Sequence, residues 1–168
     1  IASYSGDMYV GISAASENTA YVYKDPLNQL ANQRLGVAIP VQVFSIKNAT
    51  YVGFSANGQY LLFENGTKLA TYDAENEQGF TFTLPDPLDA PATHAQWMDS
   101  ARLVYVSKGQ ILAFDYDGQN RQVLVSADAR YALAFDASYK FMYAFVPGAS
   151  DKASEVLTST SLRTPADQ

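Results

Sequence analysis

A unit of two short apolar strands and a polar turn recurs along this 168-residue chain. In residues 60–73, Tyr-Leu-Leu-Phe is followed by Leu-Ala-Thr-Tyr-Asp, and in residues 102–115, Arg-Leu-Val-Tyr is followed by Ile-Leu-Ala-Phe-Asp. The two copies lie about forty residues apart, and a Gly-bearing turn separates the two strands of each. Repeats of this length that contain several short strands are typical of β-propeller blades. The chain is therefore predicted to be all-β.

Composition agrees with this prediction. Apolar residues make up 48% of the chain and charged residues 17%, as in globular proteins. The 12 Tyr and 9 Phe residues favour pleated, half-buried surfaces. A chain of this length normally forms one domain. We expect a single domain over residues 1–168.

Hairpin turn signals such as Asn-Gly and Asp-Gly divide the chain into four predicted antiparallel blades, at 1–46, 47–84, 92–126 and 129–163. The first blade contains an insertion, 26–36, in which leucine spacing predicts a short helical turn that Gly36 ends. The fourth blade lacks an outer strand, and Ile1 to Tyr4 is the expected replacement. The array is expected to close as a small propeller or to form an arc of a larger one. A β-sandwich built from the same hairpins is the alternative.

Two segments resemble the repeat of TolB-type, WD40-like propellers. Residues 54–63 (Phe-Ser-Ala-Asn-Gly-Gln-Tyr-Leu-Leu-Phe) look like its first half, which runs aromatic, Ser, Pro, Asp, Gly, Lys and then an apolar strand. Residues 114–124 are similar to its second half, whereas Ala56 stands where the family has Pro. Such repeats occur beside PEGA domains in bacterial envelope proteins and in prolyl peptidases. The resemblance implies an extracytoplasmic propeller of the bacterial envelope.

Charge and residue usage exclude several classes of function. The net charge is −6, so the phosphate backbone of a nucleic acid is repelled. The chain has no Cys, which excludes disulfides and thiolate metal sites. No apolar run approaches the ~20 residues that span a bilayer. We expect any signal or anchor segment to lie outside these residues.

Catalytic and metal chemistry find little support in the sequence. His94 is the only histidine, and no Gly-x-Ser-x-Gly elbow accompanies Ser55, Ser100 or Ser107, so we interpret His94 as a loop or interblade residue. Residues 115–120 resemble a truncated calcium loop, but the later Glu is missing and Asp-Gly predicts a hairpin turn. The acidic turn 73–77 allows a glycosidase-like carboxylate pair, although exposed acidic loops usually serve only solvation. We expect no catalytic residue, no metal and no cofactor.

Two acidic turns remain as candidate binding sites. Tyr116 lies at a turn, where a rigid amphipathic ring suits a binding patch. The predicted binding residues are Asp73, Glu75, Asp115, Tyr116 and Asp117. We expect a non-catalytic interaction or scaffold module that binds protein or peptide through the loops of one rim. The alternative is a propeller accessory domain of a peptidase or a glycan-active enzyme.

Overall fold

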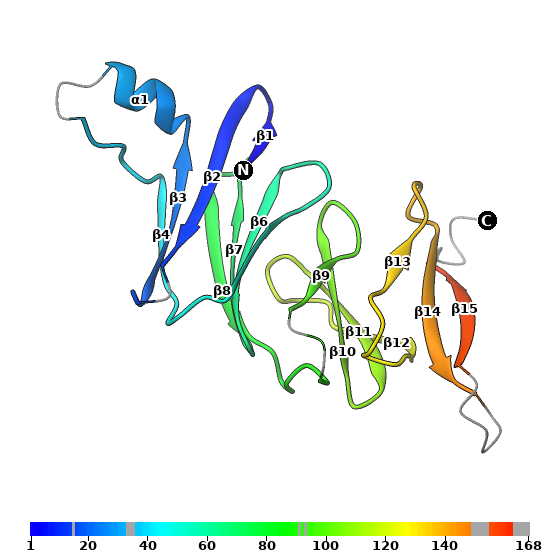
Figure 1. The fold of residues 1–168 in the computed structure, drawn as a ribbon. Helices are drawn as coiled ribbons and strands as arrows, with labels where there is room; N and C mark the ends of the chain where they lie inside the picture. Colours follow the sequence, from blue (N-terminus) through cyan, green and yellow to red (C-terminus); the bar gives the residue numbers. More distant parts are fainter. Residues whose placement is uncertain (15, 33–35, 91, 93, 149–154, 163–168) are drawn as a thin grey trace.

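The computed structural model describes residues 1–14, 16–32, 36–90, 92, 94–148 and 155–162. These residues form four antiparallel sheets and one short helix. The sheets, here called blades 1 to 4 in chain order, stand side by side in an open row with blades 1 and 4 at opposite ends (Figure 1). The predicted all-β, propeller-like array is confirmed.

Each blade is a meander in which every strand pairs with its neighbours in sequence. Blade 1 contains β1 (Ala2–Tyr4), β2 (Asp7–Ser13), β3 (Thr19–Lys24) and β4 (Gln42–Ser45). Blade 2 contains β5 (Tyr51–Phe54), β6 (Tyr60–Asn65), β7 (Lys68–Asp73) and β8 (Gln78–Thr83). Blade 3 contains β9 (Gln96–Trp97), β10 (Arg102–Ser107), β11 (Gln110–Asp115) and β12 (Gln122–Ser126). Blade 4 contains β13 (Ala134–Phe135), β14 (Phe141–Pro147) and β15 (Glu155–Ser161).

The first strand does not complete blade 4, so that expectation was wrong. β1 pairs with β2, with Ala2 opposite Tyr9 and Tyr4 opposite Asp7. Ser5 and Gly6 both have positive φ, 50° and 90°, as the two central residues of a tight hairpin turn require. This local turn folds the first strand back onto β2 at once. Among the described residues, blade 4 therefore has three strands.

The predicted insertion in blade 1 contains α1 (Pro26–Asn32). Gly36, at φ 62°, lies after the helix, whereas Leu35 falls outside the described residues. No residue of α1 is buried, so apolar packing does not hold it. The side chain of Gln29 holds the helix in place instead. Its Nε2 donates to the Lys24 carbonyl at 2.8 Å, and its Oε1 accepts from the Ile39 amide at 2.8 Å. No helix in the described part of the chain is long and apolar enough to span a membrane.

The apolar core is divided among the three interfaces between adjacent blades. In β6, Leu61 and Phe63 pack toward blade 1, while Leu62 packs toward blade 3. A strand in an inner blade is thus buried on both faces, so its sequence is apolar without alternation. A two-sheet sandwich would bury one face of each strand. The row of blades therefore excludes the sandwich alternative.

Candidate functional site

One rim of the row gathers the two acidic turns. We call it the upper rim, because it is the upper edge in Figure 1, and it carries the β5–β6, β7–β8, β9–β10 and β11–β12 turns. These turns comprise residues 55–59, 74–77, 98–101 and 116–121. Each turn follows directly from a strand of blade 2 or 3, so its position is fixed by the buried part of the blade.

An aromatic cluster joins blades 2 and 3 at this rim. The Tyr116 ring stacks on Tyr60, with centroids 4.3 Å apart and an interplanar angle of 25°. Trp97 stacks on the same tyrosine at 6.0 Å, and Phe80 meets Tyr116 edge-on at 5.3 Å. The Thr71 hydroxyl also donates to the Tyr116 carbonyl at 2.6 Å. Tyr116 is thus half-buried and held rigidly between the blades, although it belongs to a turn.

The first acidic turn is organised around a buried carboxylate. Asp73 is only 1% exposed, and its carboxylate accepts the Glu75 amide at 2.9 Å and the Asn76 side-chain amide at 2.7 Å. The Gln59 Nε2 atom donates to Asp73, to Glu75 and to the Tyr60 hydroxyl, at 3.2, 2.9 and 3.1 Å. Asp73 therefore shapes the turn, whereas the exposed Glu75 carboxylate is available to a ligand.

The second acidic turn is a hairpin between β11 and β12. Asp115 Oδ2 accepts the Asn120 side-chain amide at 2.5 Å, and Asp117 Oδ1 accepts the Gln119 amide at 2.9 Å. Gly118, at φ 81°, supplies the left-handed conformation that the turn requires. The carboxylates thus serve as turn acceptors. No group of three or more metal-ligating side chains of His, Cys, Asp or Glu occurs in the described residues.

Electrostatics link the two turns. Burial, followed by the negative charges of Asp73 and Asp117, raises the pKa of the Tyr116 hydroxyl. Burial and Asp73 likewise raise the pKa of Tyr60. For Tyr4, in blade 1, desolvation and the nearby Glu75 carboxylate raise the pKa. These hydroxyls stay protonated at neutral pH and remain hydrogen-bond donors beside a negative surface.

The structure brings the five predicted residues to one rim, on two adjacent blades. It separates their roles, because Asp73 and Asp115 shape turns while Glu75 and Tyr116 reach the surface. Sequence reasoning missed Trp97, Gln59 and Tyr60 as members of this site. One feature of the repeat could have indicated Trp97 as a site residue. Trp97 and Phe54 are aromatic residues at equivalent positions, each at the end of the first strand of its blade.

His94 lies on the opposite side of blade 3, in the connection from β8 to β9. Its ring stacks on Tyr51 of blade 2, with centroids 3.9 Å apart and nearly parallel planes. Burial lowers the pKa of the His94 imidazole, which favours the neutral ring. The Ser55 hydroxyl donates to Asn57 and the Ser107 hydroxyl to the Pro87 carbonyl. His94 therefore lies in a loop and contacts the neighbouring blade, as interpreted from the sequence.

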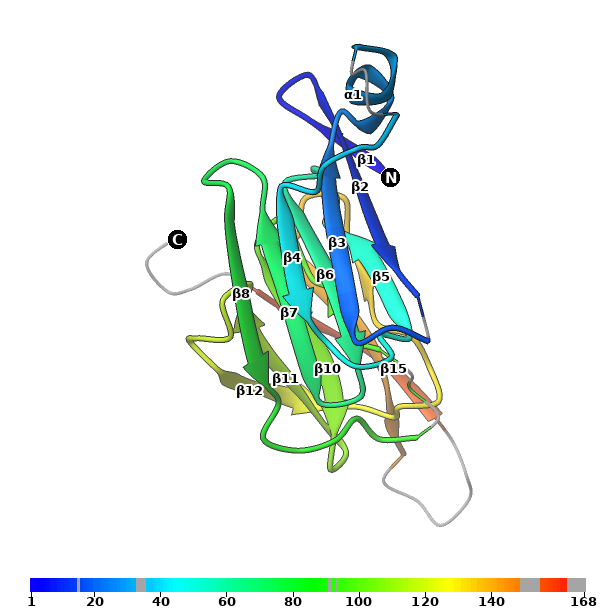
Figure 2. The ribbon, with the colours of Figure 1, turned by 90° about the vertical axis from the view of Figure 1, so that its left-hand side faces the viewer.

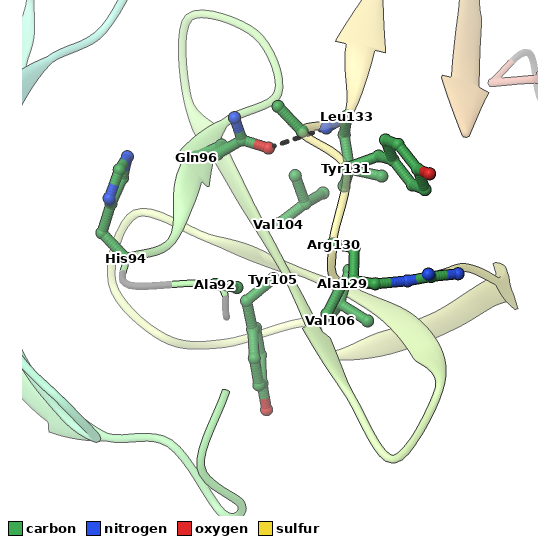
Figure 3. A pocket seen from close by; sticks show the side chains of 11 residues that line it. Ala92, His94, Gln96, Val104, Tyr105, Val106, Ala129, Arg130, Tyr131 and Leu133 are labelled. Atoms are coloured by element: carbon green, nitrogen blue, oxygen red, sulfur yellow. Dashed lines mark hydrogen bonds between the residues drawn. The ribbon is translucent and has the colours of Figure 1, made fainter. Parts of the chain in front are cut away.

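A cavity of about 200 Å³ lies beside His94, between blade 3 and the segment before β13 (Figure 3). Its wall is mainly apolar, with Val104, Val106 and Leu133. Gln96 spans one side, where its Oε1 accepts the Leu133 amide at 3.1 Å. The cavity is thus a gap in the interface between blades 3 and 4. Polar residues also line it, among them His94, Gln96 and Arg130, and the Gln96 Oε1 atom is already engaged by a backbone amide.

Comparison with known proteins gives the class of the fold. No family model and no curated protein matches the sequence. The chain is similar to the N-terminal domain of Nup159, with a TM-score of 0.54 and 13% identity over 95% of this chain. It is also similar to a eukaryotic initiation factor, with a TM-score of 0.55 and 14% identity over 92% of this chain. A third similar structure is the tricorn protease, with a TM-score of 0.55 and 12% identity, again over 92% of this chain.

The chain covers only part of each of these structures: 43% of the Nup159 domain, 39% of the initiation factor and 15% of the tricorn protease. At such low identity, the similarity establishes the fold alone. The protein is a β-propeller-like array of antiparallel blades.

Proposed function

We propose that this protein is a non-catalytic binding module that holds a protein or peptide on the upper rim of blades 2 and 3. The observation that carries the proposal is the Tyr60–Tyr116 stack, which joins an aromatic surface to the exposed Glu75 on one side and the partly exposed Asp117 on the other. Rigid aromatic side chains supply contact area with little loss of conformational entropy.

The charge of the rim indicates the chemistry of the ligand. Glu75 and Asp117 flank the aromatic cluster, and the whole chain carries a net charge of −6. The nearby Lys24 is paired with Asp7 at 3.0 Å and with Glu77 at 3.1 Å. A segment that carries Lys or Arg next to an aromatic residue is complementary to such a rim.

We further propose that the chain is a TolB-type repeat protein of the bacterial envelope and acts outside the cytoplasm. The support is the repeat resemblance in residues 54–63 and 114–124, together with the absence of Cys. Fractionation of cells that produce the tagged protein from its own gene tests this part. Recovery from the cytosol alone would contradict it.

Binding is tested with synthetic peptides that are acidic, neutral or basic and that carry one aromatic residue. Trp97 is the only tryptophan and lies 6.0 Å from Tyr60, so its fluorescence reports a ligand at the rim. We expect the basic peptide to bind best, and its affinity to fall as salt is added. Tyr116→Ala should weaken binding at least tenfold, and Glu75→Gln with Asp117→Asn should reduce the salt dependence.

Tyr139→Ala is the matched control, because Tyr139 lies in the β13–β14 turn of blade 4, on the same rim but away from the cluster. It should bind as the unchanged chain does. Equal binding of acidic and basic peptides, or binding unaffected by Tyr116→Ala, would refute the proposed site. Hydrolysis of peptide or glycoside reporters that His94→Ala abolishes would refute the non-catalytic assignment.

A further inference from the structure

Each blade packs on its neighbours through the same two faces. Backbone hydrogen bonds at equivalent places in blades 1 to 3 allow these faces to be compared residue by residue. The amides of Ala74 and Tyr116 donate to the carbonyls of Gln59 and Ala101, just beyond the paired strands of blades 2 and 3. In blade 1, the Asp25 amide donates to the Met8 carbonyl in the same way. Counting from these bonds identifies equivalent positions in the three blades.

In each of these three blades, the residue two positions after the acceptor lies opposite the residue two positions before the donor. The first is aliphatic and the second is aromatic. The pairs are Val10 with Tyr23 in blade 1, Leu61 with Tyr72 in blade 2, and Leu103 with Phe114 in blade 3. In blades 2 and 3 these pairs are buried against the preceding blade. The blade 1 pair occupies the same face, but no preceding blade covers it in the described chain.

The outward face of blade 1 is apolar beyond this pair. Ile12 and Val43 lie on it and are each 49% exposed. The rings of Tyr21 and Tyr23 lie 6.3 Å apart on the same face. Helix α1 stands at one end of the sheet and leaves this face open (Figure 2).

The outward face of blade 4 corresponds to the face that, in the inner blades, packs on the following blade. Met142 and Ala144 of β14 pack toward blade 3, so the residues between and beside them point away from the row. Phe141 is 43% exposed, and Leu157, which pairs with Phe145, is 59% exposed. In blades 2 and 3 the equivalent face packs on the following blade.

We propose that two copies of this chain associate head-to-tail, with the outward face of blade 1 in one copy packed on the outward face of blade 4 in the other. The same face-to-face packing that joins blades 1 to 4 then continues from one copy into the next. One chain carries both kinds of face, so the contact is heterologous, and two such contacts close a ring.

The size of the resulting ring fits the fold. Two copies bring together eight sheets, since the described residues of each chain form four. Closed propellers typically contain about 4–8 blades. The similar structures are also more than twice as long as this chain, which covers 43% of one and 39% of another.

Light scattering coupled to size exclusion tests the proposal on the full 168-residue chain. We expect twice the mass of one chain. Ile12→Glu places a charge on the blade 1 face and Leu157→Glu places one on the blade 4 face, so each variant alone should be monomeric. A mixture of the two retains one intact pair of faces and should form a dimer. Val123→Glu changes an apolar residue of β12 that is 57% exposed but lies on neither end face, and it should remain dimeric.

Circular dichroism and thermal melts must show that the variants are folded, which is expected because about half of each replaced side chain is exposed. A wild-type chain that is monomeric up to its solubility limit would overturn the proposal. A dimer that survives Leu157→Glu but not Ile12→Glu would also overturn it, because blade 1 would then pair with blade 1. Open filaments that either variant dissolves would retain the head-to-tail contact and refute the closed ring.

Discussion

Single residues at the blade interfaces decide properties that the repeat pattern does not reveal. Glu64 is 0% exposed in β6, between blades 2 and 3. Its Oε2 accepts the Ala95 amide at 2.8 Å, while Oε1 has no hydrogen-bond partner among the described residues. Burial raises the pKa of this carboxyl to about 7. In the sequence Glu64 directly follows the apolar run 60–63, and nothing there indicates that a second sheet covers it.

Glu64 predicts a pH-dependent free energy of unfolding. Because its folded-state pKa lies above the unfolded value, the folded chain binds the proton more tightly. Stability is then greatest near pH 4.5 and below, falls as the pH rises toward 7, and changes no further above that. Glu64→Gln should remove this slope and be more stable above pH 7 by up to roughly 3 kcal/mol.

Urea unfolding of both chains between pH 4 and 8 measures the difference. His94 has a lowered pKa and contributes an opposite slope at acidic pH, but it is present in both chains and cancels in the comparison. An equal pH dependence in the two chains would show that Glu64 is solvated.

At position 58, the need for glycine follows from the packing of blade 2 against blade 1. Gly58 has a φ of 77°, and a Cβ there would lie 2.5 Å from the backbone oxygen of Ser3 in blade 1. Gly66 has a similar φ of 57°, with open space around it. Gly66→Ala should therefore destabilise the fold by only ~1 kcal/mol, through backbone strain. Gly58→Ala should cost roughly 2–4 kcal/mol, because the clash adds to that strain.

Thermal melts of the two alanine variants make the comparison directly. Equal shifts of the melting temperature would mean that the contact between the 55–59 turn and β1 does not form. The sequence identified both glycines as hairpin residues, and it could not distinguish them, because the difference lies in a neighbouring blade.

At the scale of elements, strands within a blade were predictable and the contacts of the turns were not. The apolar runs and the Asn-Gly turn of residues 51–73 predicted β5, β6 and β7 almost to the residue. The same reasoning placed Tyr116 at a turn but did not predict the packing of its ring, since that depends on Tyr60 across the blade interface. It also assigned the first strand to the wrong blade, because it overlooked the short Ser5-Gly6 turn.

The insertion in blade 1 should behave as a separate element. We expect Gln29→Ala to accelerate hydrogen exchange in α1 about tenfold, since it removes the bonds to Lys24 and Ile39. The melting temperature should change little, because no residue of α1 is buried. Leu27→Gln replaces an exposed side chain of the same helix and should leave exchange unchanged. A large fall in the melting temperature of Gln29→Ala would show that α1 supports the whole fold.

The 115–120 turn should bind calcium weakly or not at all. Its carboxylate oxygens on Asp115 and Asp117 already accept hydrogen bonds within the turn, and calcium requires about six to eight oxygen ligands. With CaCl₂ at a concentration near the Kd of such a millimolar site, binding would stabilise the fold by only about 0.4 kcal/mol. A thermal melt with and without calcium checks this. A large rise that Asp117→Ala abolishes would reveal a metal site.

For the whole molecule, stability should vary with position in the row. Blades 2 and 3 are covered on both faces, whereas blades 1 and 4 of a single chain are covered on one. We expect amide hydrogen exchange to be slowest in β6, β7, β10 and β11 and faster in β2, β3 and β14. The monomeric Ile12→Glu chain is the sample to measure, because its end faces stay uncovered. Uniform protection would show that the four blades open only together.

Pairing between sequence neighbours also sets the order in which the chain can fold during synthesis. In the described residues every ladder joins consecutive strands, so blade 1 has all its hydrogen-bonding partners once residue 45 has left the ribosome. The face of blade 1 that carries Tyr9, Val22 and Phe44 remains exposed to solvent until residues 51–83 emerge and fold against it. Folding is then vectorial, and each newly made blade acts as the template for the next.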